Sequence, residues 1–535
     1  MRPFLHRLVL GIAAAAALAG PARAALDPGQ VAGFAGDFEA RIDAIERLGV
    51  SGGDDARRVL SALEAGTLGV IDGKVVIVDG ESVRDAASDE PISAAAQAME
   101  AVPVNNRVRR TLATARAALA LSSADAAERR AAATALADNA SAALLPAFQR
   151  ALATERDAAI REVLQGAAAR IELASPDAAR RLESARVLGE SSDPAVKALL
   201  AALLEKAGPS WAEPDAGVRA AAAASIRAIE RRVATAEIAG TVFSGLSLGS
   251  ILLLAALGLA ITYGVMGVIN MAHGELLMVG AYATYVVQGL FRAYLPDQLD
   301  LYVLAAVPAA FVAAALVGIV MERLVLRHLY GRPLESLLAT WGLSLVLIQA
   351  ARVIFGPQNV ELSNPGWMSG GVELAAGVVL PFNRIAIIGF AVFVLLLIWL
   401  TMQRTRLGMF VRAVTQNRPM AGCVGVPTAR VDTLAFAIGS GVAGLGGLAL
   451  SQIGNVGPAM GTGYIVDAFM VVVLGGVGQL AGAVWAALGL GVAAKFLEGW
   501  AGAVIAKILV LVFIIVFIQK RPQGIFALKG RFADA

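Results

Sequence analysis

The sequence contains one cysteine, Cys423, and three histidines, His6, His273 and His328. A single cysteine excludes an intrachain disulfide and a cysteine-based metal site, and so few histidines argue against a histidine-rich site. No nucleophile, general base or metal ligands are grouped at one depth of the apolar half of the chain. We therefore expect no catalytic residues, no bound metal and no cofactor.

Charged residues are also scarce: they make up 16% of the 535 residues, whereas 57% are hydrophobic. Soluble domains carry about 25% charged residues. The deficit is uneven, because the chain up to about Glu237 is rich in Arg, Asp, Glu and Ala, and the remainder contains long uncharged runs. The pattern predicts a soluble first region and a membrane-embedded second region. The basic residues of the second region lie between apolar segments, so we expect no nucleic-acid binding.

The N-terminus has the features of a signal peptide, which we assign to residues 1–24. A basic start is followed by an apolar core, Leu8 to Gly20, that is too short to span a bilayer of about 30 Å. Ala22 and Ala24 then supply the small residues that a signal peptidase requires. The alternative is a short first anchor helix. Cleavage after Ala24 would place the next region outside the cytoplasm, in the periplasm.

Residues 25–235 are expected to form this exported, mainly α-helical domain. The stretch from Arg129-Arg130 to Leu145 resembles the stretch from Arg180-Arg181 to Val196, and each reads as a helix, a polar turn and a second helix. This indicates HEAT-like repeats, although alanine-rich sequence can imitate any helical repeat. Alternating Val and Ile between Gly69 and Gly80 predict one β-hairpin.

Residues 236–535 are expected to form the membrane domain. A helix needs about 20 apolar residues to cross a bilayer, and we count about eight hydrophobic segments. These are Thr241–Met271, Leu276–Phe291, Leu301–Val320, Ser336–Ala351, Ile385–Met402, Thr433–Ile453, Ala468–Ala494 and Gly499–Gln519. The glycines within Ala468–Ala494 predict a broken or re-entrant helix there. The fold class is therefore an all-α polytopic membrane protein preceded by a helical exported domain.

The distribution of Lys and Arg predicts the orientation of the membrane domain. Basic residues are concentrated in the loops 321–335 and 403–431 and in the tail after Gln519, which should all face the cytoplasm. The loop 355–383 contains Glu361 and Glu373 and should face outward. The C-terminus is then cytoplasmic, and the chain enters the membrane from outside near Thr241. This agrees with a periplasmic first domain.

The basic loop RTRLGMFVRAVTQNRPMAGCVGVPTARV (residues 404–431) is the most informative segment. It contains helix-forming stretches and small residues that could seat a short helix in a groove on a soluble partner. The alternative is an ordinary cytoplasmic loop without a partner.

This loop resembles the ATPase-coupling loop of branched-chain amino acid ABC permeases, the LivH-like family. Three further blocks are similar to that family: INMAHGELLMVGAY (269–282), FMVVVLGGVGQLAGAVWAALGLG (469–491) and KRPQGIF (520–526). Within the family, four blocks resemble its urea-importing, UrtB-type subgroup: TWGLSL (340–345), FGPQNVELSNPGWMSGG (355–371), SQIGNVGP (451–458) and KFLEGWAGAV (495–504). The alanine richness of the N-terminal extension departs from that subgroup.

The resemblance implies a permease subunit of an ABC importer in a bacterial inner membrane. Its partners would be a second homologous permease subunit, two cytoplasmic ABC ATPase subunits and a periplasmic solute-binding protein, and it would lie in the lipid bilayer. The chain has no phosphate-binding loop of the form GxxxxGK[ST], so ATP hydrolysis belongs to a partner. The residues implied in contact with the ATPase are Arg412, Ala413, Asn417, Ala421 and Gly425.

The subgroup resemblance favours urea as cargo over a branched-chain amino acid or another small amide. Urea is neutral and has both donors and acceptors, so its path should offer amides and hydroxyls. The candidates are Asn270, Thr340, Gln349, Gln452, Asn455 and Gln479. The alternative for each is a hydrogen bond between helices without cargo contact. His273 and Glu275 are interpreted as a structural cap rather than a proton relay. A passive channel for a small neutral solute is the alternative function, followed by a membrane sensor.

Overall fold

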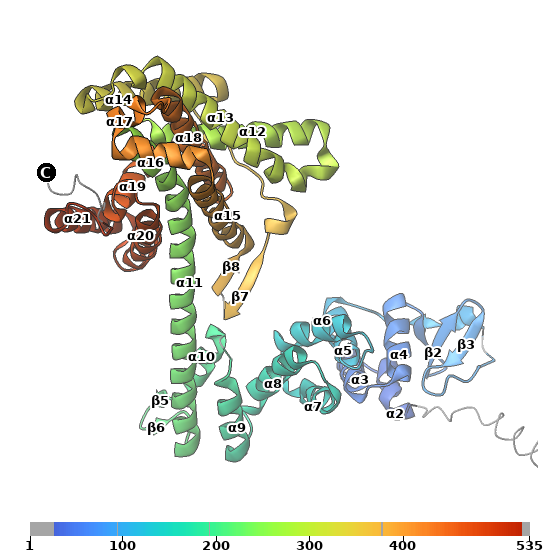
Figure 1. Ribbon diagram of the computed structural model, residues 1–535. Coiled ribbons are helices and arrows are strands. Elements are labelled where there is room, and N and C mark those ends of the chain that lie inside the picture. Colours follow the sequence, from blue (N-terminus) through green and yellow to red (C-terminus); the bar gives the residue numbers. More distant parts are fainter. Residues whose placement is uncertain (1–25, 94, 192, 376–377, 527–535) are drawn as a thin grey trace, which may run out of the picture. The chain divides into compact units, whose positions relative to one another are not determined.

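The structure is a computed structural model that describes residues 26–93, 95–191, 193–375 and 378–526. The expected signal peptide, residues 1–24, lies outside the described residues. The chain divides into two compact units between Arg231 and Arg232 (Figure 1). This boundary lies within helix α11 (Ala216–Met266). Each unit is described by itself.

The first unit begins with helices packed beside a small antiparallel sheet. The strands lie in the order β3 (Ser82–Asp85), β2 (Lys74–Asp79), β1 (Leu68–Ile71) and β4 (Glu100–Ala101). Asp72 and Gly73 join β1 to β2 with positive φ angles of 49° and 78°, the geometry that a two-residue hairpin turn requires. The predicted hairpin is thus confirmed and is extended by two more strands. The elements are α2 (Pro28–Val31), α3 (Phe38–Ser51), α4 (Asp54–Ala65), β1 (Leu68–Ile71), β2 (Lys74–Asp79), β3 (Ser82–Asp85), β4 (Glu100–Ala101) and α5 (Asn106–Ala120).

The rest of the first unit repeats a helical motif. The elements are α6 (Ala126–Ala137), α7 (Leu145–Thr154), α8 (Ala158–Glu172), α9 (Ala178–Leu188), α10 (Pro194–Ala202), β5 (Lys206–Ala207), β6 (Ser210–Trp211) and the start of α11. Arg129 on α6 forms a two-bond pair with Glu155, and Arg181 on α9 forms the same pair with Glu213. Arg181 is therefore the structural equivalent of Arg129, not Arg180 as the sequence comparison implied. Each repeat also includes a third helix.

Glu155 is a buried carboxylate at the centre of the first of these motifs. The two hydrogen bonds from Arg129, 2.8 and 3.2 Å long, are the main reason why the pKa of Glu155 falls to about 2 from its usual 4.5. The backbone amides of Arg156 and Asp157 also donate to it. Because the folded-state pKa is lowered, the stabilisation is fully present above pH 4.5 and is lost as the pH falls toward 2.

We expect Glu155→Gln to destabilise the α6–α8 region by about 2 kcal/mol at neutral pH, because charge-assisted hydrogen bonds are lost. Hydrogen–deuterium exchange of the purified full-length protein should show faster exchange in α6 and α8 at pH 7. The difference from the unsubstituted protein should shrink at pH 3. An equal difference at both pH values would mean that the charge of Glu155 contributes nothing.

The second unit is helical, with one added hairpin. Its elements are α11, α12 (His273–Tyr294), α13 (Tyr302–Leu324), α14 (Pro333–Phe355), β7 (Gly371–Ala375), β8 (Val378–Pro381), α15 (Phe382–Arg404), α16 (Arg406–Gln416), α17 (Arg418–Cys423), α18 (Thr428–Ser451), α19 (Met460–Gly475), α20 (Leu480–Ala501) and α21 (Ala503–Lys520). Among the described residues, eight helices are long and apolar enough to cross a membrane. The predicted polytopic all-α fold with about eight hydrophobic segments is confirmed.

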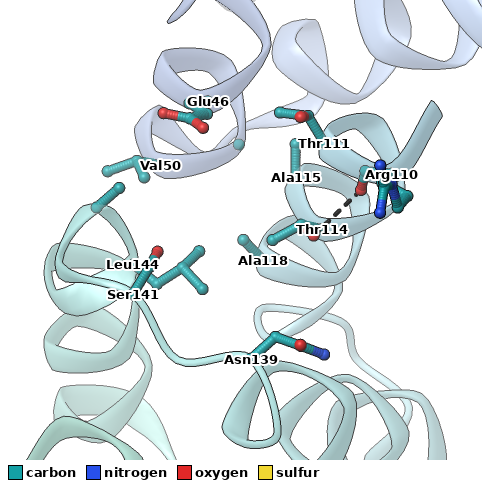
Figure 2. Close-up of a pocket in the computed structure, with 12 residues that line it drawn as sticks. Glu46, Val50, Arg110, Thr111, Thr114, Ala115, Ala118, Asn139, Ser141 and Leu144 are labelled. Carbon is teal, nitrogen blue, oxygen red and sulfur yellow. Dashed lines mark hydrogen bonds between the residues drawn. The ribbon is translucent and has the colours of Figure 1, made fainter. Parts of the chain in front are cut away.

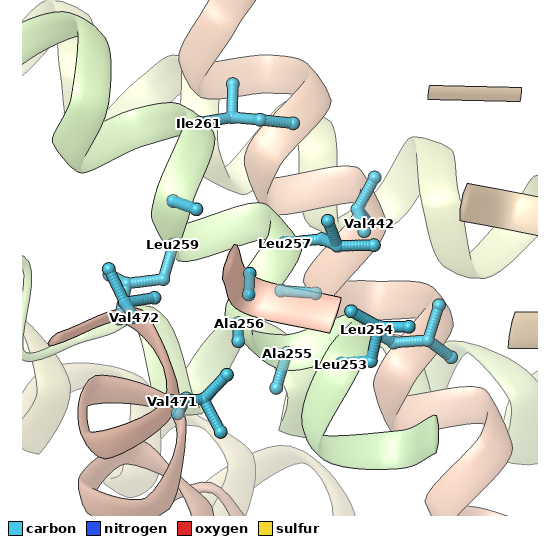
Figure 3. Packing of buried hydrophobic residues seen from close by; sticks show 14 of the residues in the cluster. Leu253, Leu254, Ala255, Ala256, Leu257, Leu259, Ile261, Val442, Val471 and Val472 are labelled. Carbon is cyan, nitrogen blue, oxygen red and sulfur yellow. The ribbon is translucent and has the colours of Figure 1, made fainter. Parts of the chain in front are cut away.

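The core of the second unit lies around α11 and α18. Residues 250–261 of α11 are all buried, and Figure 3 shows Leu254, Leu257 and Leu259 among side chains of α18 and α19, including Val442, Val471 and Val472. A helix that is apolar on every side and buried on every side is central in its bundle. In contrast, α14, α15 and α21 expose most of their large apolar side chains, which is what lipid-facing helices do.

Glycines allow α18 to approach its neighbours closely. A Cβ at Gly447 would lie 1.8 Å from the Leu277 carbonyl oxygen of α12. We therefore expect Gly447→Ala to destabilise the unit by about 1–3 kcal/mol through overpacking, measurable as a lower thermal unfolding temperature in detergent. Gly489→Ala is the matched control, because nothing lies within 4 Å of its added Cβ. Equal unfolding temperatures for the two variants would contradict this packing.

The hydrophobic segment predicted to be broken is interrupted where the glycines lie. Helix α19 ends at Gly475, Gly476 and Gly478 have positive φ, and α20 begins at Leu480. Gly482 packs directly against Gly475, because a Cβ on Gly482 would lie 1.9 Å from the Gly475 carbonyl oxygen. The segment therefore consists of the short helix α19, a glycine turn and the full-length helix α20.

Candidate functional site

Helix α14 has an unusual distribution of polarity. Its large apolar side chains, including Leu338, Trp341 and Val346, are exposed, whereas Ser336, Thr340 and Ser344 are buried. These three hydroxyl residues follow each other at intervals of four, so they lie on one face of the helix. The buried face of this helix is thus a row of hydroxyl groups, and its exposed face is apolar.

The connection between α11 and α12 contacts this hydroxyl row. The Thr340 hydroxyl accepts a hydrogen bond from the Met271 amide at 3.1 Å and donates to the Ser336 carbonyl at 2.8 Å. Asn270 is only 1% exposed, and its Oδ1 accepts from the Ala272 amide at 3.0 Å. This bond fixes the orientation of the Asn270 side-chain amide, so that Nδ2 points away from the Ala272 amide. Nδ2 has no hydrogen-bond partner within the part of the chain that the structure describes.

Glu275, on the first turn of α12, completes this polar cluster. Its carboxyl group is buried, and Oε1 accepts from the Thr462 hydroxyl of α19 at 3.2 Å. Oε2 is without a hydrogen-bond partner among the described residues. The two helices approach closely here, since a Cβ at Gly274 would lie 2.5 Å from the Gly461 carbonyl oxygen.

His273 points to a different part of the unit. Its Nε2 lies 3.0 Å from the Ala255 carbonyl oxygen of α11, and the ring is fully buried. His273 and Glu275 therefore contact different helices and do not form a relay with each other. We define the polar cluster as Asn270, Glu275, Thr340, Ser344 and Thr462.

The other expected path residues lie elsewhere. Gln452 is buried and accepts a hydrogen bond from the Tyr302 hydroxyl at 3.1 Å, so it links α13 to the end of α18. Asn455 is exposed in the connection that follows α18. Gln349 is exposed on the outer surface of α14, and Gln479 is half-buried at the start of α20. Of the six residues, the structure brings only Asn270 and Thr340 together.

The basic loop between α15 and α18 folds into the short helices α16 and α17. Asn417 caps α17 by accepting from the Met420 amide at 3.0 Å, and Gly425 ends the turn with a φ of 88°. Arg412 is exposed but donates to the Met402 carbonyl. Ala413 is half-buried and Ala421 is buried. Three of the five expected contact residues, Arg412, Asn417 and Gly425, are thus exposed, and the two alanines pack inward.

Arg418 anchors this loop to the transmembrane helices. Its guanidinium forms a two-bond pair with Asp432 of α18, one bond being 2.9 Å, and stacks over the Tyr330 ring at 4.1 Å. The Asp432 hydrogen bond is the main reason why the pKa of Arg418 is raised. Beside it, the Thr433 hydroxyl donates to the buried Glu322 of α13 at 2.8 Å. Hydrogen bonds therefore connect the loop to α18, and α18 in turn to α13.

Sequence reasoning missed Ser344, Thr462, Arg418 and Asp432. The spacing of Ser336, Thr340 and Ser344 was a usable signal, because three hydroxyl residues at helical intervals define one face. No comparable pattern marks Thr462, whose role depends on the approach of α19 to α12. Across the described ranges, no group of three or more His, Cys, Asp or Glu side chains could hold a metal ion.

Comparison with known proteins gives matches over the second unit. Residues 241–518 match the family described as "Branched-chain amino acid transport system / permease component". The BraD permease protein of the high-affinity branched-chain amino acid transport system of Pseudomonas aeruginosa is 31% identical over 53% of this chain and 93% of its own length. The LivH permease protein of Escherichia coli K12 is 30% identical over the same shares.

A more distant similarity connects the chain to a sugar permease. The ribose import permease protein RbsC of Escherichia coli K12 is 26% identical over 42% of this chain and 67% of its own length. No solved structure gives a significant match to the chain. The similarities therefore concern the membrane unit and rest on sequence.

Proposed function

Because this chain belongs to the family of branched-chain amino acid transport permease components, we propose that it is the membrane permease subunit of an ABC importer that carries urea. It is a multi-pass membrane protein and a transporter subunit rather than an enzyme. The observation that supports a transport role is the polar cluster on the inner face of α14. Hydroxyl, amide and carboxyl groups in the interior of an apolar bundle are costly unless they serve a polar solute or each other.

Urea is proposed as cargo because four sequence blocks resemble the urea-importing subgroup and because the cluster offers hydrogen-bond donors and acceptors but contains no cation. A branched-chain amino acid is the second candidate, and the names of the relatives in Pseudomonas aeruginosa and Escherichia coli favour it. An amino acid carries two opposite charges, and the Glu275 carboxylate could pair with its ammonium group. The two cargoes thus make different demands on the same residues.

The proposed orientation places α16 and α17 in the cytoplasm, where they contact one of two ABC ATPase subunits. Residues 1–24 would be a signal peptide, residues 25–235 a periplasmic domain, and residues 236–535 the permease domain with a cytoplasmic C-terminus. A second homologous permease subunit and a periplasmic solute-binding protein complete the importer. ATP binding would move the loop, and the Arg418–Asp432 pair would transmit that movement to α18.

Uptake of radiolabelled urea and leucine by cells carrying the complete importer tests the proposed function. We expect saturable urea uptake that stops when cellular ATP is depleted, with little leucine uptake. Uptake that survives ATP depletion would indicate a passive channel, and leucine uptake alone would favour the second cargo.

The only cysteine, Cys423, is exposed and lies on α17, so the natural sequence already carries a probe of orientation. In membranes that contain the permease without its ATPase subunits, a membrane-impermeant maleimide should label inside-out vesicles and should leave intact spheroplasts unlabelled. The reverse pattern would place the basic loop on the outer side and contradict the proposed coupling.

A further inference from the structure

The inner face of α14 has a chemistry that a lipid-facing helix does not need for packing. Hydroxyl residues are common where transmembrane helices pack, and each can bond to its own backbone or to a neighbouring segment. Thr340 does both, through the Ser336 carbonyl and the Met271 amide. Packing does not require the carboxyl and the amide that other segments bury beside the three hydroxyl residues of α14. Polar groups thus converge from α12, α14, α19 and the α11–α12 connection.

Two of these groups have unused hydrogen-bonding capacity. Asn270 Nδ2 is a donor and Glu275 Oε2 is an acceptor, both residues are about 1% exposed, and both atoms lack a partner among the described residues. A buried polar group without a hydrogen-bond partner is destabilising, so two of them in one cluster point to a site for a polar ligand. Both groups lie near the same face of α14, because the residue after Asn270, Met271, donates its amide to Thr340, and the Ser344 hydroxyl lies within hydrogen-bonding reach of the Glu275 carboxyl.

We propose that Asn270 and Glu275 form the cargo-selecting subsite of the permease. The subsite takes an uncharged solute with an adjacent N–H donor and C=O acceptor, that is, urea or a small carboxamide. Asn270 Nδ2 donates to the solute carbonyl and Glu275 Oε2 accepts a solute N–H. This inference rests on the proposed function, and it gives that function a substrate class and two specificity-determining residues.

The pairing favours a neutral amide over an amino acid. An amino acid would also bring a carboxylate, which needs a cation or several free N–H groups. The polar cluster contains no Lys or Arg, and the nearby Lys507 on α21 is bonded to the Gly463 carbonyl at 3.1 Å and paired with Asp467 at 3.2 Å. One donor and one acceptor match the edge of an amide.

The test exchanges the donor and the acceptor between the two positions. Glu275→Gln replaces one carboxyl oxygen by an NH₂ donor, and Asn270→Asp replaces the amide donor by an oxygen while keeping the oxygen that caps Ala272. Each single variant should raise the KM for ATP-driven uptake of radiolabelled urea roughly tenfold or more. The double variant Asn270→Asp/Glu275→Gln again offers one donor and one acceptor, so it should recover a large part of the affinity.

Controls separate a lost contact from lost folding. Leu345 lies on the exposed side of α14, so Leu345→Ala should leave the KM unchanged. The amount of each variant in the membrane is measured by immunoblot. Acetamide should compete with urea in the unsubstituted importer and less well in the single variants.

The outcomes distinguish failure of the proposed subsite from failure of the proposed cargo. If the unsubstituted importer takes up urea but both single variants keep its KM, the subsite is wrong while the proposed function stands. A double variant that is no better than the worse single variant also contradicts the donor–acceptor pairing. If the unsubstituted importer takes up leucine and not urea, the proposed cargo and the amide subsite both fail.

Discussion

Introducing glutamate at both Met420 and Val424 is expected to abolish ATP-driven uptake while the protein still accumulates in the membrane. The two side chains are 61% and 72% exposed on α17 and the turn after it, in the loop proposed to bind the ATPase. Together with the exposed arginines of this loop, the two apolar side chains form the surface that we propose contacts the ATPase. Two buried carboxylates there should weaken assembly roughly a hundredfold or more. The measurements are urea uptake and co-purification of the ATPase subunit.

The choice of these positions follows from how the loop is built. The sequence alone would suggest Arg412→Glu with Ala413→Glu, but Ala413 is half-buried and Arg412 bonds to the Met402 carbonyl. That pair would disturb the fold of α16 as well as any contact. Gln403→Glu, an exposed change in the last turn of α15 just before the loop, is the control. Normal uptake by the Met420→Glu/Val424→Glu variant would rule out this surface as the contact for the ATPase.

The sequence predicted which segments span the membrane better than it predicted which side of each helix is buried. The apolar runs located the spanning helices because length and hydropathy alone decide whether a segment can cross a bilayer. Thr340 and Gln349 both lie within one such run, yet Thr340 is buried in the hydroxyl row and Gln349 is exposed. Which side of a helix is buried depends on the neighbouring helices, and the sequence of one segment does not specify those neighbours.

Small residues in the sequence predicted some features of the structure and not others. Glycines within Ala468–Ala494 predicted the break after α19, because glycine readily adopts the positive φ that such a turn requires. For Ala413 and Ala421 the sequence did not indicate that Ala413 is half-buried and Ala421 is buried within the unit. In the alanine-rich first unit the repeat was displaced by one residue at Arg181, since alanines specify a helix but not its register. The Arg129–Glu155 and Arg181–Glu213 pairs specify that register.

Reversing the charge of Arg418 is expected to abolish uptake by a different route, by detaching α17 from the transmembrane helices. Asp432 is almost fully buried, and its carboxylate is held by Arg418, which also stacks on Tyr330. Removing one partner of a buried pair leaves an unpaired charge and costs about 3–5 kcal/mol. In Arg418→Asp two carboxylates would face each other, so the loop should lose its fixed position on α18.

The double variant Arg418→Asp/Asp432→Arg distinguishes coupling from simple destabilisation. If the pair transmits movement, the exchanged charges should restore a substantial part of the uptake that Arg418→Asp loses, and ATP hydrolysis by the purified complex should again depend on solute. Uptake and solute-dependent ATP hydrolysis are measured on the same preparation, because loss of coupling leaves hydrolysis running without transport. Full uptake by Arg418→Asp alone would show that α17 can move independently of α18. The motor would then have to act on the permease through another contact.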